Sequence, residues 1–72
     1  MTGSVAEQLK TRALALLVQK DRELTANVEA GTDTPADHED YRQERQRAGI
    51  YASSAEIGRA LENARKLERE TQ

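Results

Sequence analysis

Residues 5–30 read VAEQLKTRALALLVQKDRELTANVEA and hold most of the large aliphatic side chains of the chain. At about 100° per residue, these side chains form two adjacent stripes. One stripe comprises Val5, Leu9, Ala13 and Leu16, and the other comprises Leu14, Leu17, Leu24 and Val28. The two stripes are wider than the face that one antiparallel neighbour buries. We therefore expect a helix that packs on two sides, either against two other segments of its own chain or against its own chain and a second subunit.

Both ends of this helix carry capping residues. Ser4 and Glu7 have the spacing of a capping box, in which the hydroxyl and the carboxylate each accept a hydrogen bond from a free backbone amide. Gly31 can adopt the left-handed conformation that closes a helix. The sequence therefore predicts a helix over residues 4–30, followed by a loop over residues 31–34.

The next segment is nearly all polar. Thr34 suits an N-cap and Pro35 suits the first helical position. Acidic residues come first and arginines follow, which matches the helix dipole. Because Tyr41 and Ala48 are among its few apolar residues, we expect a helix over residues 35–48 that touches the core on one narrow side.

The last segment has a clear amphipathic pattern. Its apolar side chains share an arc of about 120°, and they are Ile50, Ile57, Ala60, Leu61, Ala64 and Leu67. Ser53 and Glu56 also have capping-box spacing and could start this helix. We expect a third helix over residues 50–70.

The directions in which the apolar side chains point around the helix axis indicate whether the second and third helices are continuous. In one unbroken helix, Tyr41 and Ala48 would point almost opposite to Ile57 and Leu61. This mismatch favours a break near Gly49. The alternative is a continuous helix whose two halves contact different subunits.

The composition limits the core that one chain can bury. Of its 72 residues, twelve are Leu, Ile or Val and two are Tyr, with neither Phe nor Trp. A domain this small buries a modest fraction of its surface. The net charge of −2 and the abundance of Ala, Glu, Leu and Arg nevertheless favour long helices over disorder. We predict an all-α fold, a hairpin of two to three helices that completes its core by oligomerising as a small helical bundle or coiled coil.

Several features bear on where the protein acts. The chain has no cysteine and therefore no disulfide framework. Its N-terminus lacks a basic region, and no apolar run has the length of a signal peptide or a bilayer span. We expect a cytoplasmic protein that does not associate with membranes. Arginine outnumbers lysine and alanine is abundant, which points to a bacterial or phage source.

Ionisable side chains crowd together at residues 37–40, Asp-His-Glu-Asp. Helical metal sites place ligands three or four residues apart on one face. The residues at those offsets from His38 are Thr34, Pro35, Tyr41 and Arg42. None of the four is a good ligand, so we expect neither a metal nor another cofactor.

Catalytic motifs are also missing from the sequence. It has no cysteine nucleophile, no Ser and His in a strand-turn-helix setting and no glycine-rich phosphate loop. Charged residues lining a helical dimer could still bind an anionic substrate, in the manner of chorismate-mutase-like bundles. Arg12 and Lys20 border the apolar stripes and would be the residues to test. We favour the interpretation that both extend to solvent from the edge of a buried face, and we expect no enzymatic activity.

Residues 54–61, SAEIGRAL, resemble the first helix of many helix-turn-helix units. The resemblance implies DNA binding, and the basic residues available for phosphate contacts are Arg59, Arg65, Lys66 and Arg69. Residues 62–64 continue the helical stripe where that motif needs a turn, and the whole chain is slightly acidic rather than basic. A small DNA-binding regulator is therefore the alternative function.

The function that we favour is protein association, as an adaptor, assembly or inhibitory protein. The partner would be a second copy of the chain or another protein. Tyr41 and Arg45 are residue types favoured at interface hot spots. The residues predicted to lie at the interface are Leu14, Leu17, Leu24, Val28, Tyr41, Ile57, Leu61 and Leu67.

Overall fold

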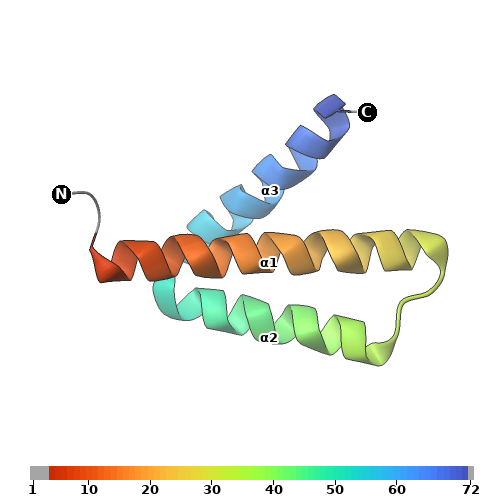
Figure 1. Ribbon diagram of the computed structural model, residues 1–72, viewed down its shortest axis with the longest axis horizontal. Coiled ribbons are helices and arrows are strands. Elements are labelled where there is room, and N and C mark those ends of the chain that lie inside the picture. The colour runs from red at the N-terminus through yellow and green to blue at the C-terminus, as the bar shows by residue number, and fades with distance from the viewer. Residues whose placement is uncertain (1–3, 72) are drawn as a thin grey trace.

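The structure, a computed structural model, describes residues 4–71 and is helical throughout that range apart from short connections. Its helices are α1 (Val5–Ala30), α2 (Pro35–Tyr51) and α3 (Ser54–Thr71). In Figure 1, α1 and α2 lie side by side as an antiparallel hairpin, and α3 emerges from behind α1 and runs obliquely away. The predicted all-α fold is confirmed.

Ser4 and Gly31 cap α1 as predicted, but of the two bonds of the predicted capping box only the one to the Ser4 hydroxyl is present among the described residues. The Ser4 hydroxyl accepts a hydrogen bond from the Glu7 amide at 3.2 Å. At the other end, Gly31 has φ 73°, and its amide donates to the Val28 carbonyl at 3.1 Å. A left-handed residue here lets the chain reverse direction after α1.

A full capping box starts α2. The Thr34 hydroxyl accepts from the Asp37 amide at 3.2 Å, and the Asp37 carboxylate accepts from the Thr34 amide at 2.9 Å. Pro35 occupies the start of the helix, as predicted. The return bond from Asp37 was not anticipated, although its three-residue spacing from Thr34 is visible in the sequence.

The break between α2 and α3 was predicted at the wrong position. Helix α2 continues through Gly49 and ends at Tyr51, and Ala52 is extended with φ −130° and ψ 152°. The Ser53 hydroxyl accepts from the Glu56 amide at 3.2 Å, and the Glu56 carboxylate accepts from the Ser53 amide at 3.1 Å. This capping box gives hydrogen-bond partners to backbone amides at the start of α3, and it therefore favours a break at Ser53. A glycine inside a helix lowers the stability of the helix only modestly, so α2 continues through Gly49.

One consequence concerns Ile50, which the sequence places on the apolar stripe of the third helix. Because the break follows it, Ile50 belongs to the last turn of α2, and it is 75% exposed. The buried stripe of α3 instead begins at Ile57, which is 5% exposed.

The core draws on all three helices. Leu17 is fully buried, and Leu14, Val18 and Tyr41 pack partly buried against the central cluster. The buried apolar side chains are Ala13, Leu17, Ala48, Ala52, Ile57, Leu61 and Ala64. Most of them are alanines, so few large apolar side chains contribute to the core. Helix α1 thus packs against both other helices of its own chain.

Ion pairs connect α1 to α3 along the length of their contact. Their atoms are Lys10 Nζ and Glu56 Oε2 at 2.8 Å, Asp21 Oδ1 and Arg65 Nη2 at 3.2 Å, and Arg22 Nε and Glu68 Oε1 at 3.2 Å. The partners occur in the same order along both helices, so α3 runs in the same general direction as α1.

Candidate docking surface

One side of α1 remains exposed and is bordered by α2. Residues at alternating spacings of four and three share this side, which is the spacing of a coiled-coil seam. We call this set the outer seam, and it comprises Val5, Leu9, Arg12, Leu16, Gln19, Glu23, Ala26 and Ala30. All eight are exposed.

The N-terminal half of the outer seam is apolar and is flanked by α2. Leu9 and Leu16 are 39% and 36% exposed, and Tyr51 of α2 is 39% exposed beside them. These three side chains, with Arg12 and Arg47, line a shallow depression of about 260 Å³. We call this part of the surface the basic end.

The C-terminal half of the seam has no large apolar side chain and borders the start of α2. A second depression, of about 300 Å³, is lined by Glu23, Leu24 and Ala26 of α1 and by Asp37 and Asp40 of α2, among other residues. Lys20 also lines it, and its ammonium lies 3.5 Å from the Glu23 carboxylate. Because the three carboxylates outnumber this lysine, we call this part the acidic end.

The order of charges along α2 explains the two ends. Its acidic residues precede its arginines, and the hairpin is antiparallel. The acids therefore lie beside the C-terminal half of α1, while Arg47 lies beside the N-terminal half, where it lines the depression with Arg12. The order of acidic and basic residues along α2 therefore makes one end of this surface acidic and the other end basic.

The predicted interface residues fall into three groups. Those buried in the core of one chain are Leu17, Ile57 and Leu61. Those half-buried are Leu14, Leu24 and Tyr41, and those exposed are Val28 and Leu67. The two stripes on α1 are each divided: Leu17 is buried and Val28 is exposed in one, whereas Ala13 is buried and Val5, Leu9 and Leu16 are exposed in the other.

Sequence reasoning did not select Leu9, Leu16 or Tyr51 as surface residues. The spacing of Leu9 and Leu16 showed that they share a stripe, but both stripes of α1 are similarly apolar. Only the positions of α2 and α3 decide which side chains of each stripe remain exposed. Tyr51 was missed because the break was placed before it rather than after it.

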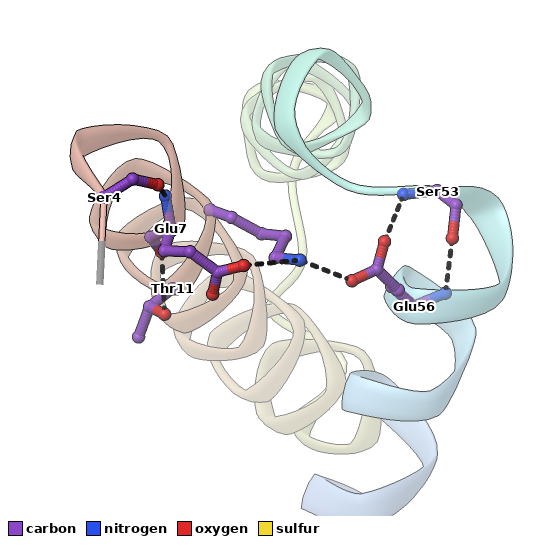
Figure 2. Close-up of polar contacts among 6 residues, drawn as sticks. Ser4, Glu7, Thr11, Ser53 and Glu56 are labelled. Atoms are coloured by element: carbon purple, nitrogen blue, oxygen red, sulfur yellow. Dashed lines mark hydrogen bonds and ion pairs between the residues drawn. The ribbon is translucent and has the colours of Figure 1, made fainter. Parts of the chain in front are cut away.

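A polar network joins the N-terminus of α3 to α1 (Figure 2). The Glu56 carboxylate accepts hydrogen bonds from the Lys10 ammonium and from the Ser53 amide, and the ammonium also lies 3.8 Å from the Glu7 carboxylate. The hydrogen bond from Lys10, followed by those from Ser53, lowers the pKa of Glu56 to about 2. Glu56 raises the pKa of Lys10 in turn. These contacts link the start of α3 to the first turns of α1.

The acidic cluster around His38 does not form a metal site in the part of the chain that the structure describes. The His38 imidazole Nε2 lies 2.8 Å from the Asp33 carboxylate, whose pKa it lowers through this hydrogen bond. Within residues 4–71, no group of three or more His, Cys, Asp or Glu side chains is placed to hold a metal ion. Nor does any helix in this range combine the length and apolarity needed to cross a bilayer.

A separate groove of about 490 Å³ lies between α2 and α3. Tyr41 and Arg45 line it from α2, and Glu62, Arg65 and Arg69 line it from α3. Two of the four basic residues considered for phosphate contacts, Arg65 and Arg69, are therefore brought together here. Helix α3 is continuous through residues 62–64, where a helix-turn-helix unit needs a turn.

Among the surfaces of residues 4–71, we compare the outer seam with its α2 flank and the basic groove between α2 and α3. The first combines apolar side chains with charges of both signs, whereas the second is mainly basic. Comparisons with protein-family models, with curated proteins and with solved structures found no match for this chain.

Proposed function

We propose that the protein is a small non-enzymatic interaction module of the cytoplasm, an adaptor, assembly or inhibitory protein. It associates through the outer seam and the adjoining face of α2. The observation that supports this proposal is the clustering of Leu9, Leu16 and Tyr51 in one exposed depression between Arg12 and Arg47. Contiguous exposed apolar side chains mark interaction sites on soluble proteins, and Tyr and Arg are favoured at interface hot spots.

The fold of one chain leaves more than a third of each of these apolar residues exposed. The buried cluster consists of other residues, and neither Leu9 nor Leu16 is among the side chains packed against it. A role in contacting a partner accounts for the apolar surface that a single chain leaves exposed here.

A charge placed in the depression tests the proposal. Leu16→Glu should abolish association, because a partner would have to bury the new carboxylate against Leu9 and Tyr51. Ala15→Glu is the matched control, since Ala15 is exposed on α1 outside the outer seam. Association is measured as the mass of the purified protein in solution and as recovery of partners from a host lysate. If Leu16→Glu retains the same mass and the same partners as the control, the proposal is wrong.

The basic groove favours DNA binding as a second candidate function. Three arginines surround Tyr41 there, with Glu62 as the one acidic residue of the lining. If this groove binds DNA, the affinity should fall steeply as the salt concentration rises. The double variant Arg45→Ala, Arg69→Ala should make the affinity less dependent on salt, because fewer phosphate contacts remain. Arg65 is a poor choice for this test because it also pairs with the buried Asp21.

A further inference from the structure

The outer seam is complementary to the outer seam of a second copy of α1 that runs in the opposite direction. When two copies of α1 lie antiparallel, each seam residue of one helix faces a seam residue of the other, as in the layers of a coiled coil. The facing pairs in one register are Val5 with Ala30, Leu9 with Ala26, Arg12 with Glu23, and Leu16 with Gln19. In each pair, the two positions lie equally far along the sequence from a point midway between Leu17 and Val18. A single two-fold axis through that point therefore relates the two helices, and each facing pair occurs twice in the dimer.

Size and charge both agree with this register. The large residues of the N-terminal half face alanines or a flexible glutamine, and Arg12 faces Glu23. A parallel pairing in register would instead place Arg12 against Arg12 and Glu23 against Glu23. Like charges in contact disfavour that arrangement, so the seam selects the antiparallel one.

Helix α2 adds to the same complementarity. A two-fold axis perpendicular to the plane of the two α1 helices keeps both copies of α2 on one side of that plane. Arg47 flanks Arg12, and Asp40 flanks Glu23. The antiparallel pairing therefore brings the basic end of each copy to the acidic end of the other, where Glu23, Asp37 and Asp40 outnumber Lys20.

We propose that the occupant of the docking surface is a second copy of this chain. The two copies form a closed dimer by antiparallel pairing of their outer seams, with Tyr51 and Arg47 of each copy covering the edge of the pair. This inference rests on the proposed function, because it uses the same surface and names the partner that binds there.

A charge-reversal experiment tests the pairing directly. Arg12 and Glu23 lie about 16 Å apart along α1 at about 1.5 Å per residue, so they do not pair within one chain. Arg12→Glu alone and Glu23→Arg alone should each weaken the dimer at least about tenfold, because like charges then face one another twice. An equimolar mixture of the two variants should dimerise like the wild type, since every facing pair is again of opposite sign.

The measurement is sedimentation equilibrium, with circular dichroism to show that each variant is folded. Arg59→Glu is the control for the charge change, because Arg59 is exposed on α3, away from the seam. Failure of the mixture to regain the wild-type mass would overturn the inference. So would a wild-type chain that stays monomeric at about 0.1 mM, a concentration at which weak dimers associate.

Cross-linking separates the antiparallel pairing from any other. The natural chain has no cysteine, so a Leu9→Cys chain mixed with an Ala26→Cys chain should form a disulfide-linked heterodimer in glutathione buffer. Leu9→Cys alone should not cross-link to itself, and efficient self-linkage would overturn the pairing. A further outcome is that the wild-type chain is monomeric but binds another protein, and that Leu16→Glu abolishes this binding. That result would overturn the dimer and leave the proposed function intact.

Discussion

Asp21 Oδ1 lies 3.2 Å from Arg65 Nη2, and the two residues differ sharply in exposure. Asp21 is 6% exposed, whereas the Arg65 side chain is 62% exposed. A carboxylate that is nearly excluded from water thus receives its compensating charge from a residue of another helix that remains in contact with solvent. The pair makes the position of α3 against α1 sensitive to a single surface arginine.

Removing that arginine should destabilise the fold. We expect Arg65→Ala to lower the free energy of unfolding by about 1 to 2 kcal/mol, less than the about 3 to 5 kcal/mol of a fully buried pair because Arg65 is exposed. Urea denaturation followed by circular dichroism measures the loss. Asp21→Asn in the Arg65→Ala background should recover part of it, since the neutral amide needs no counter-charge. A double variant no more stable than Arg65→Ala would contradict this account.

Acid should weaken the junction between α1 and α3 through Glu56. Its pKa is about 2 in the folded protein, below the ordinary value of 4.5. Because the folded state binds this proton more weakly than the unfolded state, the contribution of Glu56 is fully present above about pH 4.5 and is lost as pH falls towards 2. Urea unfolding at a series of pH values should show a smaller decrease over this window for Glu56→Gln than for the wild type. Glu70→Gln, an exposed change on the same helix, should follow the wild-type curve.

The box that starts α3 should depend on one hydroxyl. Ser53→Ala removes the acceptor of the Glu56 amide and should cost about 1 kcal/mol of unfolding free energy. Ser54→Ala is the matched control, because Ser54 is the first residue of α3 and alanine is favoured in helices. Equal stability of the two variants in chemical denaturation would show that the cap contributes little.

Two glycines should respond to alanine with opposite signs. Gly31 has a positive φ, so Gly31→Ala should destabilise by about 1 kcal/mol although nothing lies near the added methyl. Gly58 lies within α3, where an added Cβ also meets no atom within 4 Å. Gly58→Ala should therefore stabilise by about 0.5 to 1 kcal/mol. Thermal denaturation should show a lower melting temperature than the wild type for Gly31→Ala and a higher one for Gly58→Ala.

Local hydrogen-bonding patterns could be predicted well from the sequence. The caps at Ser4, Gly31 and Thr34 depend on residues within a few positions of one another, and all three are present. The end of α2 could not be placed from the same information. Gly49 weakens a helix only slightly, and the stronger box at Ser53 decided the outcome.

Long-range packing was harder to predict. Residues Leu9 and Leu17 are similar in type and both lie on apolar stripes, yet one is exposed and the other is fully buried. This difference arises from where α2 and α3 cross α1, which local periodicity does not specify. For the same reason, the predicted interface residues include core positions such as Leu17 and omit Tyr51.

The alanines of the core have a consequence for how the protein can vary. Ala13 and Ala48 belong to the buried cluster and contribute one methyl each. Ala48 is fully buried, so a larger residue there would have to displace its neighbours and would push α1 and α2 apart. That separation would also move Tyr51 away from Leu16, and the surface would lose its shape without any change in its own residues.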